Sequence, residues 1–165
     1  MRVLLTNDDG IQAPGIAAMY HALADTWGEF GGTPIGGAAT TVDCIAPMTV
    51  QSATGHGVTF HQPLMVRKEV LFGTGDHAGR TGRTPEVVGF GVDGRPADCV
   101  KLALSCLWPE KYGAGSRPDL VVSGMNSGAN CGINVIYSGT VAAALEAAFL
   151  GVPSIAVSLH IGPAG

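Results

Sequence analysis

The strongest constraint on this chain is an apolar run near its beginning that ends directly in two acids. Residues 2–6 (RVLLT) lack the polar alternation of a half-exposed strand, which predicts a strand buried on both faces. Gly10 gives the chain the conformational freedom for a tight turn after this strand. Pro14 suits the first turn of a helix, and apolar residues at helical spacing predict that helix over residues 14–24. A strand, a loop and a helix in this order indicate the opening unit of a doubly wound α/β sheet.

In a doubly wound sheet, ligands bind at the carboxyl ends of the strands, which is where Asp8 and Asp9 fall. Adjacent carboxylates repel each other unless a positive charge lies nearby, and their oxygens are ligands that Mg²⁺ and Mn²⁺ prefer. The same residues could equally form a solvated turn, since such sequences are common in loops. Taken alone, the two acids leave a metal site and a plain turn open.

The composition is that of one ordinary domain over residues 1–165. Hydrophobic residues make up 46% of the chain and charged residues 13%, so the sequence supplies enough apolar side chains for a core. A formal net charge of −4 gives no electrostatic reason to expect a nucleic acid polymer or an anionic membrane as a partner. The most apolar region, residues 141–159, contains Glu146 and a Gly-Val-Pro turn, which predicts a helix and a strand rather than a membrane span.

The start of the chain and its cysteines both favour a cytoplasmic location. The chain opens with a strand pattern rather than with a basic leader and a cleavage site. Its cysteines form no CxxC pair and have no zinc-type spacing with histidine, so we expect buried free thiols in a reducing compartment. These residues are Cys44, Cys99, Cys106 and Cys131.

Buried strands and helices alternate along the rest of the chain. Apolar runs predict further buried strands over residues 41–46, 87–92, 119–123 and 154–159. The pattern of residues 58–66 favours another strand or hairpin arm, although Pro63 disfavours a strand at this position. The alternation predicts a mostly parallel sheet with helices on both faces, an α/β fold.

Two further helices are predicted between these strands. One begins at Pro96, and its core face carries Val100, Ala103, Leu104 and Leu107 at helical spacing. The other covers residues 141–150. The glycine-rich stretches 28–41 and 73–83 are expected to be surface loops, and the second lacks the Gly-Lys-Ser/Thr ending of a phosphate-binding P-loop.

Polar loops follow three of the predicted strands. If these strands are parallel, the loops open on one edge of the sheet and bring oxygen-bearing side chains together. Two carboxylates, a hydroxyl and amide carbonyls form an all-oxygen set that suits a hard divalent cation. The residues are Asp8, Asp9, Ser52, Asn126 and Asn130.

A fourth polar element, Ser138-Gly139-Thr140, opens the predicted helix over residues 141–150. Free N–H groups and the helix dipole make a helix start a ready anion site. A cation beside an anion site is the arrangement that phosphoester hydrolysis requires.

Each of these residues also has a plainer structural interpretation, which the pattern alone leaves open. Ser52 could be an ordinary loop serine, and the two asparagines could serve a glycine-rich turn. Ser138 and Thr140 could be helix caps and nothing more. The histidines give little direction, although His56 and His61 flank the Ser52 loop and are weak candidates for a functional role.

Five segments of the chain resemble, in order, the signatures of the SurE family of survival-protein nucleotidases. The first covers residues 4–16, with the sequences NDDG and APGI, and the second covers residues 46–52, with Ala-Pro and Gln-Ser at its ends. The third is PADCV at residues 96–100. The fourth covers residues 118–130, and the fifth is YSGTV at residues 137–141. Together they span nearly the whole chain, which makes the resemblance specific.

The resemblance implies a three-layer, Rossmann-like α/β/α fold and a metal-dependent phosphohydrolase. The expected reaction removes phosphate from nucleoside monophosphates, as a 5′-nucleotidase does, with 3′-nucleotidase or exopolyphosphatase activity as further options. The expected cofactor is one Mg²⁺ or Mn²⁺ ion per subunit. The family also implies a cytoplasmic homodimer or homotetramer that has a nucleoside monophosphate as its partner, rather than a nucleic acid polymer or a membrane.

Carried over residue by residue, the resemblance also implies roles within the site. The metal ligands would be Asp8, Asp9, Ser52 and Asn126. The substrate-binding residues would be Asn7, Ser138, Gly139 and Thr140. The catalytic residues would be Asp8, Asp9 and Asn130.

The chain departs from the family pattern in three places. Residues 48–50 (MTV) stand where many members carry polar or basic residues, and Arg95 stands where threonine is more usual. Family members also usually continue well beyond the point that corresponds to Gly165, with a segment that helps to build the oligomer and wall the active site. We therefore expect the metal site to be complete in this sequence and the substrate pocket to lack part of its wall.

Two rival functions stay open at this level. A phosphatase of the haloacid-dehalogenase kind also places acids after the first strand, but it needs an acid two residues beyond its nucleophile, where this chain has Gly10. A non-catalytic nucleotide- or metal-binding module would bind its ligand without turnover. Within the phosphohydrolase hypothesis, either a water molecule or Asp8 could be the nucleophile.

Overall fold

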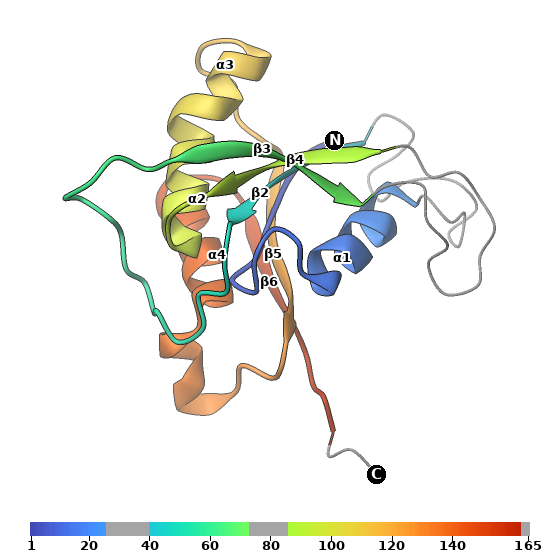
Figure 1. The fold of residues 1–165 in the computed structure, drawn as a ribbon, viewed down its shortest axis with the longest axis vertical. Helices are drawn as coiled ribbons and strands as arrows, with labels where there is room; N and C mark the ends of the chain where they lie inside the picture. The colour runs from blue at the N-terminus through green and yellow to red at the C-terminus, as the bar shows by residue number, and fades with distance from the viewer. Residues whose placement is uncertain (26–39, 73–85, 163–165) are drawn as a thin grey trace.

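The computed structural model describes residues 1–25, 40–72 and 86–162, and within these residues six strands form one sheet (Figure 1). The order across the sheet is β3-β4-β2-β1-β5-β6. Neighbouring strands are parallel, except that β3 and β4 are antiparallel. The strands are β1 (Arg2–Thr6), β2 (Thr41–Pro47), β3 (Val66–Phe72), β4 (Val87–Val92), β5 (Leu120–Ser127) and β6 (Ser154–Leu159).

Helices cover both faces of the sheet, so the fold has three layers (Figure 1). Helix α1 (Pro14–Ala24) lies on one face. On the other face, α2 (Pro96–Leu102) continues through a π-helical turn, η1 (Ala103–Leu107), into α3 (Trp108–Tyr112). Helix α4 (Gly139–Phe149) packs beside α2. The predicted three-layer α/β/α fold with a mostly parallel sheet is confirmed.

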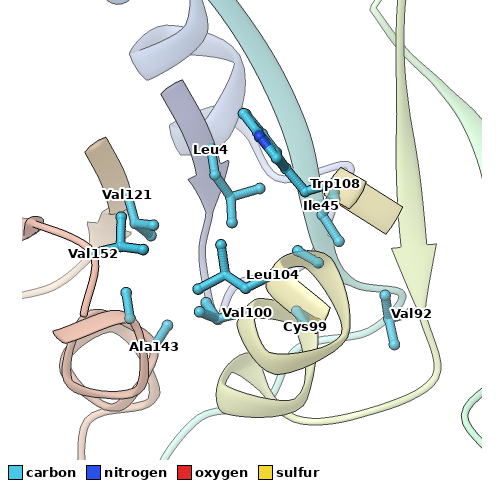
Figure 2. Close-up of a cluster of buried hydrophobic side chains, with 12 residues drawn as sticks. Leu4, Ile45, Val92, Cys99, Val100, Leu104, Trp108, Val121, Ala143 and Val152 are labelled. Carbon is cyan, nitrogen blue, oxygen red and sulfur yellow. The ribbon is translucent and has the colours of Figure 1, made fainter. Parts of the chain in front are cut away.

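The two apolar cores explain why β1 shows no polar alternation. Successive side chains of a strand point to opposite faces of its sheet. Leu4 therefore packs against residues such as Val100 under α2 and α4, as Figure 2 shows. Val3 and Leu5 point the other way and pack with Ile16 of α1. Because both faces are covered, all three strand residues are fully buried.

Most predicted elements have closely matching bounds in the structure. The strands β1, β4 and β6 and the helix α1 have the predicted bounds, and β2 is one residue longer than predicted. Helix α4 begins at Gly139, within the sequence that was expected to open it. The core face predicted for the helix from Pro96 is also confirmed, because Val100, Ala103 and Leu104 are buried and Leu107 is partly buried against the same core.

The strand predicted over residues 58–66 is wrong, because the first strand after β2 begins only at Val66. Pro63 cannot donate a ladder hydrogen bond. The N–H of Thr59 is not available for a ladder either, since it donates to the Asp98 carboxylate at 2.7 Å. The true strand, β3, has charged residues in its middle, which is typical of an edge strand and masks its apolar pattern.

The strand predicted over residues 119–123 is longer than expected. Strand β5 continues to Ser127 through residues that were expected to form a polar loop, and its register against β6 shifts between Ser123 and Asn126. A 3₁₀ helix that the sequence pattern did not indicate, η2 (Gly132–Tyr137), then leads into α4.

The remaining predictions have mixed outcomes. Cys44 and Cys99 are buried free thiols as expected, but Cys106 and Cys131 are exposed, so the prediction of burial is wrong for that pair. Of the predicted surface loops, residues 28–39 and 73–83 lie outside the described residues. Within the described ranges, no helix is long and apolar enough to cross a membrane.

Helix α1 approaches β5 so closely that Gly15 has no room for a side chain. A Cβ atom at Gly15 would lie 2.0 Å from the carbonyl oxygen of Met125. Helix propensity alone predicts that Gly15→Ala stabilises the chain by about 1 kcal/mol. Because the overlap forces α1 away from β5, we instead expect Gly15→Ala to lower the free energy of unfolding by about 1–3 kcal/mol in urea denaturation. An unchanged or higher free energy of unfolding would contradict this packing.

Candidate functional site

A hollow of about 320 Å³ lies where β1 and β5 end and α4 begins. Its wall is made by the turn after β1, the segment after β2, the end of β5 with the residues that follow, and the start of α4. None of the lining residues has a positively charged side chain. Most of the predicted site residues line this hollow, namely Asp8, Asp9, Ser52, Asn126, Asn130 and Ser138.

Asp8 is the more buried of the two acids, with 5% of its surface exposed. Its Oδ1 atom accepts a hydrogen bond of 2.5 Å from the hydroxyl of Thr140 in α4. Burial raises the pKa of Asp8; the Thr140 hydrogen bond opposes this rise, and the nearby charge of Asp9 adds to it. A positive charge in the hollow would stabilise this carboxylate, and the lining side chains do not provide one.

Asp9 and Asn126 are held by backbone groups around the end of β5. The Oδ2 atom of Asp9 accepts the N–H of Ser127 at 2.8 Å, which ties the turn after β1 to β5. The side-chain amide of Asn126 donates to the carbonyl of Gly128 at 2.8 Å. Within the described part of the chain the amide oxygen of Asn126 has no hydrogen bond, so it is available as a ligand.

Ser52 is exposed and reaches the hollow from the segment between β2 and β3. The preceding residue, Gln51, donates its N–H to the carbonyl of Asp8 at 2.8 Å. The following residue, Ala53, has a φ of 57°, a conformation that costs a residue with a side chain about 1–2 kcal/mol. The position of Ser52 is therefore set by the contacts of its neighbours rather than by local backbone preference.

Ser138 and Asn130 already have polar partners within the protein. The Oγ atom of Ser138 accepts the N–H of Val141 at 3.2 Å. The hydroxyl of Ser138 is therefore a helix cap, which was the structural alternative to a role in ligand binding. The amide of Asn130 donates to the hydroxyl of Ser158 at 2.8 Å. The first N–H groups of α4 have no carbonyl partner within the helix, as at any helix start.

The other three predicted residues lie behind the hollow rather than on its wall. Thr140 is fully buried and directs its hydroxyl to Asp8. Gly139 lets α4 approach, because a Cβ atom there would lie 2.7 Å from the Cβ of Asp8. Asn7 is also fully buried, and its amide holds Gly10 through hydrogen bonds of 2.8 and 3.2 Å. The side chains of Asn7 and Thr140 thus position the turn and the acid.

The donor set of the hollow fits a hard divalent cation. It offers two carboxylates together with serine hydroxyls and asparagine amide oxygens, and oxygen ligands of these types are the ones that Mg²⁺ and Mn²⁺ prefer. Across the described ranges, no three His, Cys, Asp or Glu side chains gather as a metal cluster. The observation that favours a cation is the buried carboxylate of Asp8, which lies beside a second acid and lacks a positive neighbour on the wall.

Asp98 and Glu146 are two buried acids that hold the Ser52 segment, and the sequence gives little indication of this role. Asp98, at the start of α2, accepts the N–H and the hydroxyl of Thr59, both at 2.7 Å. Glu146, in α4, lies 2.8 Å from the Nε2 atom of His56. The only sign of the second acid in the sequence is a charge within an otherwise apolar helix.

A larger hollow, of about 490 Å³, lies between β2, β4 and α3. Its wall is mostly apolar and includes Ile45, Phe90 and Trp108. It contains none of the predicted site residues, so the smaller hollow with its oxygen-bearing side chains is the better candidate for chemistry.

Known proteins resemble this chain in both sequence and structure. A family model described as "Survival protein SurE" matches residues 3–163. The protein named 5′-nucleotidase SurE from Desulforudis audaxviator is 48% identical over 96% of this chain and 51% of its own length. The protein of the same name from Nitratidesulfovibrio vulgaris is 49% identical over 96% of this chain and 47% of its own length.

The crystal structure of the SurE protein from Aquifex aeolicus has the same fold. It superimposes with a TM-score of 0.71 at 35% sequence identity, covering 98% of this chain and 52% of that one. The chain therefore spans about half the length of the curated relatives that it matches.

Replacing Asp8 by asparagine should stabilise the cation-free protein. The asparagine keeps an oxygen for the Thr140 hydroxyl and removes a charge that burial disfavours. With a chelator present, we expect Asp8→Asn to raise the free energy of unfolding at neutral pH by about 1–2 kcal/mol in urea denaturation. Asp93→Asn, at an exposed position, is the matched control and should change little.

The pH dependence of this gain follows from the direction of the shift. Because the pKa of Asp8 is higher in the folded state than in the unfolded state, the folded state binds the proton more readily. The wild type therefore loses stability as the pH rises through the interval between the two values. The gain from Asp8→Asn should be small at about pH 3 and grow toward neutral pH. A gain that is the same at every pH would show that the charge of Asp8 is not its cause.

Proposed function

The chain belongs to the survival protein SurE family, and on that basis we propose that it removes phosphate from nucleoside monophosphates with the help of a divalent cation. The observation that carries the proposal is the hollow in which the buried Asp8 and its oxygen-bearing neighbours lie beside the start of α4. The names of the curated relatives favour a 5′-nucleotidase, a phosphoric monoester hydrolase. Activity toward 3′-nucleotides or polyphosphate belongs to the proposal as an additional substrate range.

In this proposal one Mg²⁺ or Mn²⁺ ion is held by Asp8, Asp9, Ser52 and Asn126. When bound, such a cation polarises the phosphate and lowers the pKa of a water molecule. The contribution of the chain is to fix the ligands before the substrate arrives. The Thr140 hydroxyl orients Asp8 from behind, in the way that hydrogen-bond partners commonly orient ligating carboxylates.

The start of α4 would bind the phosphate group. Ser138 lines the hollow, and the N–H of Gly139 directly behind it lies at the positive end of the helix dipole, which favours an anion. The N–H of Thr140 interacts with the Asp8 carboxylate, so Thr140 would act on the phosphate through that acid. The amide of Asn130, which now donates to Ser158, could turn to a phosphate oxygen and stabilise charge that develops in the transition state. The side chain of Asn7 takes no part in this step, since both ends of its amide are engaged with Gly10.

We extend the proposal to a homodimer or homotetramer in the cytoplasm. The edge strand β6 and the end of α4 expose large apolar side chains, among them Phe149, Ile155 and Leu159, which favours contact with another protein surface. Free thiols at Cys44 and Cys99 are typical of a reducing compartment. A net charge of −4 supports a small substrate rather than a nucleic acid polymer.

Mn²⁺ should stabilise the wild-type chain against heat and should not stabilise Asp8→Asn. A ligand that binds only the folded state raises the free energy of unfolding by about 2.7 kcal/mol at 100 times its Kd. The measurement compares melting temperatures in MnCl₂ and in chelator, and the control Asp93→Asn should respond as the wild type does. Equal stabilisation of the wild type and Asp8→Asn would place the cation outside the hollow.

The wild type should also release phosphate from nucleoside 5′-monophosphates in the presence of Mn²⁺ or Mg²⁺. We expect the chelator or Asp8→Asn to lower the rate by about a hundredfold or more, because both remove the cation from the reacting phosphate. Nucleoside 3′-monophosphates and polyphosphate, assayed separately, define the substrate range. Mn²⁺ binding that depends on Asp8 but yields no phosphate from any of these compounds would favour the non-catalytic binding module instead.

A further inference from the structure

The segment between β2 and β3 carries Ser52 and has no helix or strand of its own. Residues 48–65 reach out from the sheet and pass η2 and the start of α4 (Figure 1). The hydroxyl of Ser52 makes no hydrogen bond to any described residue. Its place beside Asp8 and Asp9 therefore depends on how the residues on either side of it are anchored.

On one side the anchor is the Gln51 N–H on the carbonyl of Asp8. On the other side Thr54 donates its hydroxyl to the carbonyl of Gln51 at 2.9 Å, which closes the turn around Ser52 locally. The first side chain after this turn that contacts another element is His56. Its Nε2 atom lies 2.8 Å from Oε2 of Glu146, and its ring stacks on Phe149 with the centroids 5.5 Å apart and the planes at 18°. Both partners belong to α4, so the position and the orientation of the imidazole are fixed by one rigid element. The adjacent N–H of Gly55 donates to the carbonyl of Tyr137 at 3.0 Å and fixes the same point against η2.

Glu146 is placed as an internal partner rather than as a surface charge. It is 6% exposed, and its helix neighbours Ala143 and Ala147 belong to the core under α4. A carboxylate in such a position requires charged or hydrogen-bonding partners. His56 provides the close contact, and the Nζ atom of Lys101 lies 3.6 Å from the other carboxylate oxygen.

The same helix also holds the buried acid of the site. Thr140, in the first turn of α4, donates to Asp8, and Glu146, further along the helix, holds His56. Helix α4 is therefore a common frame that sets Asp8 and the Ser52 segment relative to each other. Ala53, whose φ is 57°, lies between the two anchors.

We propose that the His56–Glu146 pair is a positioning device for Ser52, which keeps the serine hydroxyl within reach of a cation held by Asp8 and Asp9. This inference rests on the proposed function, because it concerns a ligand of the same cation. His56 acts through the backbone of residues 52–56 and is a positioning residue, not a ligand.

The test is the affinity of the chain for Mn²⁺ alone, measured by isothermal titration calorimetry. His56→Ala removes both contacts with α4 and should weaken Mn²⁺ binding by about tenfold, the effect typical of losing an outer partner of a metal ligand. His56→Gln keeps a donor for Glu146 and should recover much of the affinity. His61→Ala is the matched control, since this exposed histidine of the same segment has no contact with Glu146 and should leave the affinity unchanged.

The double variant Ser52→Ala/His56→Ala separates positioning from a general loss of structure. If His56 acts through Ser52, His56→Ala should weaken Mn²⁺ binding in the wild-type background and have little further effect in the Ser52→Ala background. Wild-type affinity in His56→Ala, or the same loss in both backgrounds, would overturn the inference.

A second variant keeps the inference testable if His56→Ala does not fold. Glu146→Leu keeps a side chain of similar size but removes the hydrogen-bond acceptor of His56, and it should reproduce the loss of affinity in the wild-type background but not with Ser52→Ala. A loss that is independent of Ser52 would again overturn the inference. Failure of the wild type to bind Mn²⁺, or wild-type affinity in Asp8→Asn, would overturn the proposed function itself.

Discussion

The rest of the structure depends on one electrostatically unfavourable placement, the burial of the Asp8 carboxylate at the end of β1. Burial raises the pKa of this group, and a second acid follows it directly in the chain. The protein offsets part of this through the Thr140 hydroxyl and the positive end of the α4 dipole. The remaining compensation is of the kind that a divalent cation gives. Without a ligand, a buried carboxylate of this kind lowers the stability of the folded state. The favourable packing of the surrounding fold offsets that loss.

That placement is possible only because the surrounding elements approach one another closely. Gly139 brings the start of α4 against Asp8, and Gly15 brings α1 against the end of β5, each at a distance that a Cβ atom would not allow. Asn7 closes the turn by holding Gly10 from both ends of its amide. This explains why the segments that resemble family signatures contain residues that do not face the hollow. Several of these residues shape the turn and the packing behind Asp8 rather than contact a ligand.

The sequence allowed the strand-end cluster to be predicted because its signals are local. A strand buried on both faces must be apolar throughout, and a parallel sheet must bring the ends of such strands to one edge. The edge strand β3 escaped prediction because its charges, which protect an exposed edge, resemble a loop. The partners of Asp98 and Glu146 could not be predicted, since each acid binds a residue 39 or 90 positions away in a segment without secondary structure. Long-range side-chain pairs of this kind leave no periodic trace in a sequence.

The contacts that hold the expected cation ligands all lie within the described part of this chain. Thr140 holds Asp8, the backbone at Ser127 holds Asp9, and α4 holds the segment that carries Ser52. The contacts that position the proposed ligands are thus internal to the chain, although the chain spans about half the length of its curated relatives. The proposed turnover would make a further demand, because a nucleotide substrate would also need walls around its nucleoside. Cation affinity and phosphate release therefore report on different parts of the molecule. The first depends on the anchors around Asp8, whereas the second depends also on whatever surrounds the open side of the hollow.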